Sequence, residues 1–367
     1  MKLANACIAE SPLSTAKSGR GLHALQAAGA RTGALENAPA SWSACSPLPL
    51  SNRLLRSRLP GCLLVALTGL MLAATPLFAD ASWAGVKSWV YQLTKYKDNK
   101  LDEIANAGFD LAVIDLARDG KGGFFTREEI EAVKKRGVIV LAYFEIGAIE
   151  NYRPEWPGIP EDLKVGVVKG WPKERLVKFW EERWWPVVKG RVDQALTAGF
   201  DGAYLDMVTA YEEIPAKEMK REELAHKMVE LISRLSQYAK AKNPQFKIVP
   251  QNCPELYNWS YWDGTPNEKY INAVDGLGIE DVFYLAHDRP ATMQWAKESR
   301  DNAMAIKRAG KLVLGVDYAK KPECIADAYA KQRAIGFVPY VTVVQLDVVR
   351  PEGAAGTKPP PTKDDSK

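Results

Sequence analysis

The sequence predicts an α/β protein folded as a (β/α)8 TIM barrel, and three observations lead to this fold class. First, short apolar runs alternate with helical stretches from Trp83 to about Arg350, which is typical of a parallel sheet. Second, eight such runs fit into roughly 260 residues, which is close to the usual size of such a barrel. Third, glycines follow four of the helical stretches, where a left-handed residue commonly ends a helix: Gly108, Gly137, Gly199 and Gly310.

The predicted elements follow one another regularly along the chain. Strands are expected at 89–93, 111–116, 138–146, 176–180, 203–208, 246–251, 277–284 and 311–318. Helices are expected at 99–107, 126–135, 186–198, 217–241, 292–309 and 322–335. A further apolar run at 337–344 makes a ninth strand. Either this run is an extra strand near the C-terminus of the barrel, or 176–180 is not a barrel strand.

The N-terminal 81 residues are predicted to lie outside the barrel. Residues 1–52 are rich in Ala, Ser, Gly and Pro without a sustained period, so we interpret them as a disordered or wrongly assigned N-terminal extension. Residues 53–81 have the order of a signal peptide: three arginines, an uncharged apolar run at 62–74, and a small-x-small cleavage site at 79–81. The alternative is an uncleaved membrane anchor, because the charge-free stretch 59–79 has 21 residues and is long enough to span a bilayer.

The charge distribution argues against nucleic acid as a partner. The net charge of +4 arises from residues 1–58, which carry +5, whereas the remaining 309 residues carry −1. A barrel at 83–350 that is almost neutral lacks the basic surface that nucleic-acid-binding proteins use. From the signal segment 53–81 we expect a secreted or periplasmic protein that contacts a membrane only through that segment, if it is not cleaved. We also expect a monomer. The tail at 351–367 is rich in Pro, Lys and Asp and is expected to be disordered.

Carboxylates follow five of the predicted strands. The segments 107–115 and 198–206 share the pattern Ala-Gly-Phe-Asp-x-Ala-x-x-Asp, and 275–280 keeps its second half. The strand-end carboxylates are Asp115, Glu145, Asp206, Glu280 and, on the expected eighth strand, Asp317. Because the active site of a barrel lies at the C-terminal ends of its strands, and because burying unpaired charges is costly, five such residues indicate a shared acidic site. For any one of them alone, a role in capping the next loop is the simpler interpretation.

The residue types available point to glycoside hydrolysis. After residue 81 the chain has only two histidines, His226 and His287, so a histidine-rich metal centre is excluded. A nucleophile elbow, a Walker loop and a dinucleotide-binding glycine motif are also absent from the sequence. A pair of carboxyl groups, one ionised and one protonated, is the usual apparatus of glycosidases, and we expect neither a metal nor a cofactor. Tryptophans in or near predicted loops offer faces for sugar stacking: Trp156, Trp171, Trp184, Trp185, Trp259 and Trp262.

Six short motifs occur in order along the chain: Tyr-Phe-Glu-Ile-Gly at 143–147, Gly-Trp-Pro-x-Glu at 170–174, Gly-Phe-Asp-Gly-x-x-x-Asp at 199–206, Pro-Gln-Asn at 250–252, Gly-Ile-Glu at 278–280 and Val-Asp-Tyr at 316–318. Over about 83–344 this set resembles glycoside hydrolase family 114, the endo-α-1,4-polygalactosaminidase-like barrels. The resemblance implies a (β/α)8 fold and retaining hydrolysis of a galactosamine-containing polysaccharide. The family's catalytic pair, an Asp closing the fifth strand and a Glu on the seventh, matches Asp206 and Glu280. The sequence departs from the family at Lys178, where many members have an acid, and in the longer segment 258–270.

These expectations define a mechanism. Asp206 is expected to act as the nucleophile, and Glu280 as the general acid/base, its pKa raised by apolar neighbours such as Phe283 and Tyr284. The two roles remain exchangeable, because the sequence does not show which carboxyl group is desolvated. The residues expected to bind sugar hydroxyls or a ring ammonium are Asp115, Tyr143, Glu145, Asn252, Tyr284, Asp317 and Tyr318.

Two other classes of protein fit part of the pattern. A non-catalytic exported polysaccharide-binding barrel would keep the fold and the aromatic residues, but it would not need both Asp206 and Glu280. A metal-dependent phosphodiesterase barrel also gathers acids at strand ends, but it normally needs histidines, and His226 and His287 are poorly placed for that role.

Overall fold

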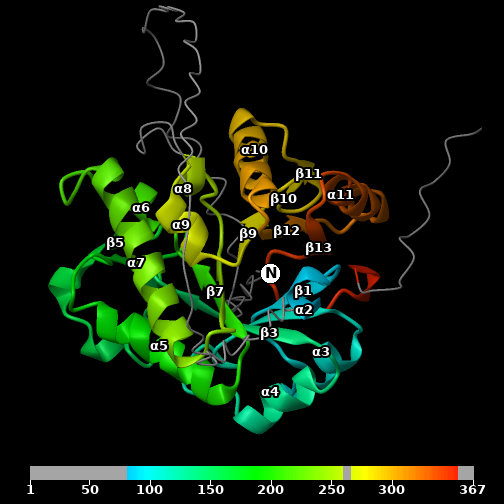
Figure 1. Cartoon of the computed structure of the whole chain (residues 1–367), viewed down its shortest axis with the longest axis horizontal. Helices are drawn as coiled ribbons and strands as arrows, with labels where there is room; N and C mark the ends of the chain where they lie inside the picture. The colour runs from blue at the N-terminus through cyan, green and yellow to red at the C-terminus, as the bar shows by residue number, and fades with distance from the viewer. Residues whose placement is uncertain (1–80, 259–265, 354–367) are drawn as a thin grey trace, which may run out of the picture.

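Eight parallel strands form the centre of the molecule in the computed structural model, which describes residues 81–258 and 266–353 (Figure 1). Five of them pair in the order β1-β2-β3-β7-β8 and three in the order β13-β12-β9. A parallel bridge between Gln251 and Gly278 connects β8 with β9. The eight strands are β1 (Trp89–Gln92), β2 (Leu111–Asp115), β3 (Ile139–Glu145), β7 (Gly202–Asp206), β8 (Lys247–Pro250), β9 (Gly276–Glu280), β12 (Leu312–Tyr318) and β13 (Val338–Thr342). The predicted (β/α)8 fold is confirmed.

The first and last strands meet around Trp89. Its indole Nε1 donates a hydrogen bond of 2.9 Å to the carbonyl of Val338, and the amide of Leu93 donates one of 2.7 Å to the carbonyl of Leu346. The Trp89 ring also lies 6.2 Å from the ring of Tyr204 and 5.9 Å from that of Tyr340. Strands far apart in sequence are therefore joined by a buried aromatic cluster inside the barrel.

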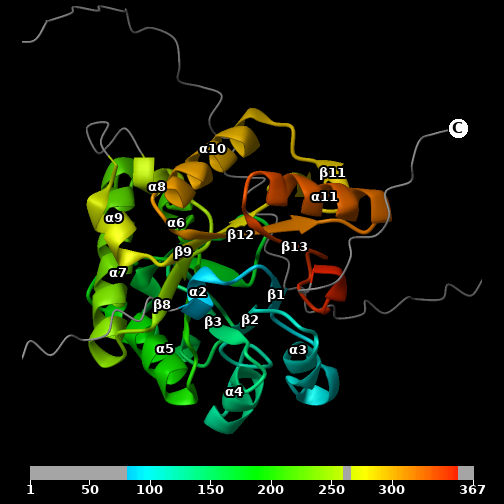
Figure 2. The same ribbon diagram turned by 45° about the vertical axis from the view of Figure 1, so that its right-hand side comes forward.

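Helices surround the strands on the outside (Figure 2). The sequence explains several helix ends: Thr126 and Glu129 form a capping box at the start of α4, and Gly199, with φ of 85°, ends α5. The α-helices in the described residues are α2 (Ala81–Ala84), α3 (Asp102–Asn106), α4 (Arg127–Lys134), α5 (Trp185–Ala198), α6 (Ala210–Glu213), α7 (Arg221–Lys242), α8 (Glu255–Asn258), α9 (Glu268–Ala273), α10 (Gln294–Arg308) and α11 (Pro322–Ala334).

The strand predicted at 176–180 is not a barrel strand. It corresponds to β6 (Glu174–Val177), which pairs antiparallel with β4 (Ala148–Glu150) and β5 (Lys164–Val167) in a separate small sheet between β3 and α5. The run at 337–344 is accordingly the eighth barrel strand, β13, and not an addition. A short apolar run does not reveal its partners, which is why the sequence left both interpretations open. In the corrected order Asp206 ends the fourth barrel strand, Glu280 the sixth and Asp317 the seventh.

Strand β9 is shorter than the predicted 277–284. It ends at Glu280 because Asp281 adopts a left-handed conformation, with φ of 54°, and the chain then forms the hairpin of β10 (Tyr284–Leu285) and β11 (Arg289–Pro290). The C-terminal tail also begins later than expected, since residues Pro351–Gly353 form a 3-10 turn with Gly353 buried.

Several predictions fall on residues outside the described part of the chain. These are the extension 1–52, the signal segment 53–81 apart from its last residue, most of the tail, and Trp259 and Trp262 within the segment 258–270. None of the helices described is both long enough and apolar enough to cross a membrane.

Candidate active site

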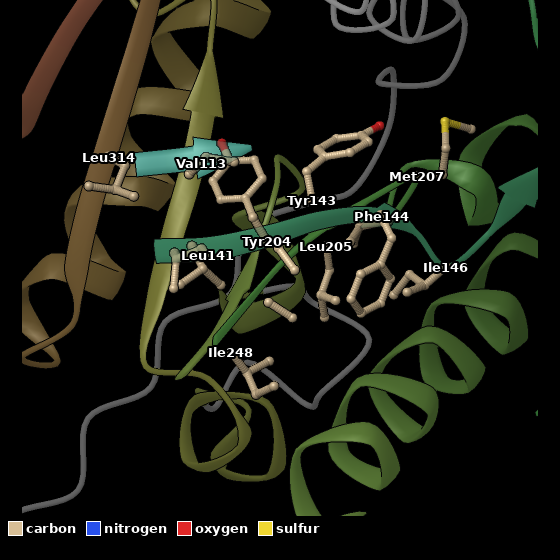
Figure 3. Packing of buried hydrophobic residues seen from close by; sticks show 14 of the residues in the cluster. Val113, Leu141, Tyr143, Phe144, Ile146, Tyr204, Leu205, Met207, Ile248 and Leu314 are labelled. Atoms are coloured by element: carbon tan, nitrogen blue, oxygen red, sulfur yellow. The ribbon is translucent and has the colours of Figure 1, made fainter. Parts of the chain in front are cut away.

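The alternation of side chains along the barrel strands places Asp206 in the barrel interior. Tyr143 and Glu145 on β3 pair in register with Tyr204 and Asp206 on β7, so these four side chains share one face. Figure 3 shows Tyr143 and Tyr204 on one side of their strands, with Phe144 and Leu205 on the other. Because Tyr204 contacts Trp89 and Tyr91 inside the barrel, that shared face is the interior.

The Asp206 carboxylate is held by two donors. The hydroxyl of Tyr143 donates to Oδ2, and the amide of Met207 donates to Oδ1 over 2.6 Å. Met207 adopts a left-handed conformation with φ of 57°, which turns the chain away immediately after the carboxylate. Asp206 is only 6% exposed, so its orientation is fixed by the surrounding protein.

The Glu280 carboxylate, two strands along the barrel from Asp206, is held in a closely similar way. The hydroxyl of Tyr318, on β12, donates to Oε1, and the side-chain amide of Asn252 donates to Oε2 over 3.0 Å. The backbone amide of Glu280 in turn donates to Oδ1 of Asn252 over 3.1 Å. Thus Tyr143, Asn252 and Tyr318, which were predicted to bind substrate, all contact one of the two predicted catalytic carboxylates.

The two carboxylates act on one common neighbour. Burial, together with the negative charges of Glu280 and Asp206, raises the pKa of Tyr204 well above its ordinary value. The Tyr204 hydroxyl lies against Gly278, two residues before Glu280, and Tyr204 itself is two residues before Asp206, so the two carboxylates end the two strands that this side chain connects, β7 and β9. The C-terminal ends of the strands form the face on which barrel enzymes carry their active sites.

Asp115 also lies at this end of the barrel, but a partner already occupies its carboxylate. Arg153 donates to both oxygens of Asp115 over 2.9 Å and also to Glu150 over 2.8 and 3.0 Å. All three side chains are buried. Sequence reasoning missed Arg153, because it follows the short strand β4, and no motif connects it with Asp115. This ion cluster fixes the loop after β3 beside the mouth of the barrel.

We expect Arg153→Met to lower the free energy of unfolding by about 3–5 kcal/mol, because it leaves two buried carboxylates without their cation. Arg183→Met is a matched control, since Arg183 also pairs with two acids, Asp162 and Glu181, but its side chain is 49% exposed against 7% for Arg153. The control should cost about 0–1 kcal/mol. Urea unfolding at pH 7 measures both values, and equal costs would contradict a structural role for the buried cluster.

Asp317 points away from the barrel interior. Its neighbour Tyr318 faces inward to Glu280, so alternation along β12 turns Asp317 toward α11. There it accepts hydrogen bonds from the amides of Phe283 and Tyr284 over 2.7 and 2.9 Å, and from Gln332 over 2.8 Å. Asp317 therefore anchors the loop after β9 and does not take part in the shared acidic site.

Tyr284 is directed to the same outer layer. Its hydroxyl donates to Asp327 of α11 over 2.7 Å, and its ring packs with Ala319 and Ile325. The expectation that Tyr284 provides apolar surroundings for Glu280 overlooked the turn at Asp281, which leads the chain outward after the strand.

The burial of Asp317 should make the free energy of unfolding depend on pH. Burial outweighs the hydrogen bonds it accepts and raises its pKa from 3.8 to about 6. A carboxyl group with a raised folded-state pKa contributes stability below about pH 4 that is lost as the pH rises through 6, a total of about 3 kcal/mol. Asp317→Asn should remove this loss, because the Gln332 amide can turn to accept from the new side chain. We expect the variant to be more stable than the parent protein at pH 8, measured by urea unfolding from pH 4 to 8; an unchanged slope would contradict the assignment.

Glu145 is a third carboxylate at this end of the barrel. Glu145 is buried beside Asp206, and its backbone carbonyl accepts a 2.6 Å hydrogen bond from Arg191 of α5. Within 81–258 and 266–353 no three His, Cys, Asp or Glu side chains are grouped so as to hold a metal ion. Trp184, one of the tryptophans expected to stack on sugar, is fully buried and donates to the carbonyl of Ile146.

Comparison with solved structures supports the fold. The glycoside hydrolase domain of PelA from Pseudomonas aeruginosa superposes with a TM-score of 0.57, at 15% identity, over 72% of this chain and 98% of that one. Ega3 of Aspergillus fumigatus, solved in complex with galactosamine, gives a TM-score of 0.56 at 16% identity, over 71% of this chain and 93% of that one. Both superpositions support the barrel fold of this chain.

Comparison of sequences identifies the family. Uncharacterized proteins from Methanocaldococcus jannaschii and Deinococcus radiodurans are 33% and 30% identical, over 69% and 74% of this chain and over 74% and 85% of their own lengths. The family model of glycoside-hydrolase family GH114 matches residues 73–355, which include the whole barrel and both strand-end carboxylates. The chain is thus a glycoside hydrolase and belongs to family GH114.

Proposed function

We propose that this chain is an exported retaining glycoside hydrolase that cleaves a galactosamine-type amino-sugar polysaccharide. The observation that carries the proposal is the pair of buried carboxylates, Asp206 and Glu280, at the C-terminal ends of two barrel strands, each held by a tyrosine hydroxyl and an amide donor. Retaining glycosidases need two carboxyl groups in one cleft, one as nucleophile and one as acid/base.

In this mechanism the Asp206 carboxylate attacks the anomeric carbon and displaces the glycosidic oxygen, which takes its proton from Glu280. The ionised Glu280 then removes a proton from water, and that water releases the sugar from Asp206. The donors on Asp206 orient its carboxylate for attack. The contact of Glu280 with Asn252 and Tyr318 keeps its carboxyl group in place through both steps.

The choice of an amino sugar rests on charge and on similarity. Glu145, Asp206 and Glu280 bring several carboxylates to one buried region, which favours a cationic ring with a free amino group. Ega3, which shares the barrel architecture, was solved with galactosamine. A polysaccharide of de-N-acetylated galactosamine is therefore the substrate we expect.

A panel of polysaccharides tests this function. The purified protein is incubated with deacetylated and fully acetylated galactosamine and glucosamine polymers, and new reducing ends are measured. We expect cleavage of the deacetylated galactosamine polymer, and proton NMR during the reaction should show a first product with the anomeric configuration of the substrate. Binding without new reducing ends would contradict the assignment, and an inverted product would contradict the retaining mechanism.

Export rests on the N-terminal sequence. We propose that residues 53–81 direct the chain out of the cytoplasm and are removed, because three arginines, an apolar run and a small-x-small site follow one another there. N-terminal sequencing of the protein from its native compartment should give a start near Ser82. A protein that begins at Met1, or one that behaves as an integral membrane protein, would contradict the proposal.

A further inference from the structure

Tyr204 crosses the barrel beneath the two carboxylates. It lies two residues before Asp206 on the inner face of β7, and the centre of its ring is 5.3 Å from the centre of the Tyr91 ring. Its hydroxyl reaches Gly278 on β9, which lies two residues before Glu280 on the inner face of that strand. A methyl group at Gly278 would overlap the Tyr204 hydroxyl, so the glycine makes room for it. One side chain therefore spans from the strand of the proposed nucleophile to the strand of the proposed acid/base.

The Tyr204 hydroxyl is not used by the fold. Its oxygen is fully buried and has no hydrogen-bond partner in the part of the chain that the structure describes. Neighbouring tyrosines differ in this respect, since Tyr91 donates to Gln251, Tyr143 to Asp206 and Tyr318 to Glu280. A buried hydroxyl without a partner destabilises a protein, and such costs are found most often at functional sites.

We propose that Tyr204 is a positioning residue of this glycosidase site, whose O–H group stabilises the ionised member of the Asp206–Glu280 pair and thereby sets the pH range of activity. The inference rests on the proposed function, because it takes these two carboxylates as the reacting pair. Because the hydroxyl makes no hydrogen bond among the described residues, it acts through its dipole. An O–H dipole turned toward a carboxyl group favours the charged form of that group, and it does so more strongly in a dry interior than in water.

The surroundings of Tyr204 keep this donor available. Burial and the two carboxylates raise its pKa, so the hydroxyl stays protonated at every pH at which the enzyme would work. The titratable groups facing the pair are Glu145 and Tyr143 from β3 and Tyr318 from β12, with Tyr91 on the ring of Tyr204 and Asp281 following Glu280. Tyr91, Tyr143 and Tyr318 each donate to an acceptor in the protein, whereas Tyr204 does not.

Tyr204→Phe separates this role from simple packing, because it keeps the ring and removes only the hydroxyl. We expect kcat/KM to fall about 10- to 100-fold, mainly through kcat, and the acidic limb of the pH profile to move up by roughly half to one pH unit. Tyr270→Phe is the matched control, since Tyr270 on α9 is also a fully buried tyrosine whose hydroxyl has no hydrogen-bond partner among the described residues. The titratable groups near it are Cys253 and Glu255 and not the catalytic pair, so removing its hydroxyl should leave both readouts unchanged.

A second measurement does not depend on turnover. The carboxyl carbons of Asp206 and Glu280, labelled with ¹³C and assigned by their loss in Asp206→Asn and Glu280→Gln, are titrated by NMR in the parent protein and in Tyr204→Phe. We expect the apparent pKa values of the pair to be higher in the variant. Identical titration curves would overturn the role of Tyr204, even if the enzyme acts on another polymer. A parent protein that cleaves none of the polymers would overturn the proposed function and leave the titration valid.

The stability of the two variants completes the test. Removing a hydroxyl that has no structural partner should leave the urea midpoint of Tyr204→Phe equal to or above that of the parent protein, as for Tyr270→Phe. A marked loss of stability in Tyr204→Phe alone would show that its hydroxyl serves the fold, and it would overturn the proposal.

Discussion

Asp206→Asn is expected to lower kcat by about 10⁴-fold or more while the protein stays folded. The amide has the same shape as the carboxylate, and its oxygen can still accept from the Met207 amide, so the turn after β7 should persist. An amide, however, is too weak a nucleophile to form the covalent glycosyl-enzyme. Release of reducing ends from the deacetylated galactosamine polymer measures the loss, and urea unfolding verifies the fold.

Asp201→Asn is the matched control for this variant. Asp201 immediately precedes β7, at the end opposite Asp206, where it accepts from the amide of Val140 over 2.9 Å and pairs with Lys134. The same chemical change at the opposite end of the same strand should reduce stability slightly and leave kcat within about two-fold of the parent value. Substantial activity in Asp206→Asn, or an equal loss in Asp201→Asn, would contradict the assignment of the nucleophile.

The sequence was sufficient to locate Asp206 and Glu280 because each directly follows an apolar strand. In a parallel barrel all strands end at the same face, so carboxylates in that position lie at that face whatever the loops do. The repeated pattern at 107–115 and 198–206 strengthened this prediction, because it showed that a helix, a turn and a strand precede the carboxylate in the same way.

The direction of each side chain could not be predicted as well. Both faces of a barrel strand are buried, one by the interior and one by the helices, so an apolar run carries no alternation that marks the inner face. Asp317 and Tyr318 illustrate the problem: one residue separates a loop anchor on the outside from a contact with Glu280 on the inside. Their position at a strand end, within the Val-Asp-Tyr motif, led the sequence analysis to assign both residues to the substrate.

Contacts between distant segments were beyond the sequence altogether. The partnership of Arg153 with Asp115 depends on how the small sheet of β4, β5 and β6 folds over the barrel, and the sequence left open whether part of that sheet was a barrel strand. The sequence could not show either that the hydroxyl of Tyr204 has no hydrogen-bond partner among the described residues, because this depends on its position against Gly278 of another strand. Both features result from packing in three dimensions, which strand periodicity does not encode.

Glu280→Gln should lower activity on the polymer by about 10²- to 10⁴-fold, because the glycosidic oxygen then leaves without a proton. The glutamine can keep its contacts with Asn252 and Tyr318, so the site should retain its shape. A substrate with a good leaving group needs little protonation, and on an activated aryl galactosaminide we expect only a small reduction in the first step. A loss of equal size on both substrates would mean that Glu280 is not the acid.

Glu280→Ala carries the test further, because the smaller side chain leaves room for azide. If Glu280 is the acid/base, azide attacks the covalent intermediate on Asp206, restores turnover and gives a glycosyl azide with the anomeric configuration of the substrate. If the two carboxyl groups have exchanged roles, azide replaces the missing nucleophile directly and the product has the opposite configuration. The two tyrosine-held carboxylates look alike in their contacts, since each accepts from one hydroxyl and one amide. The configuration of the azide product therefore decides what those contacts leave open: which carboxyl group attacks the sugar and which one handles the proton.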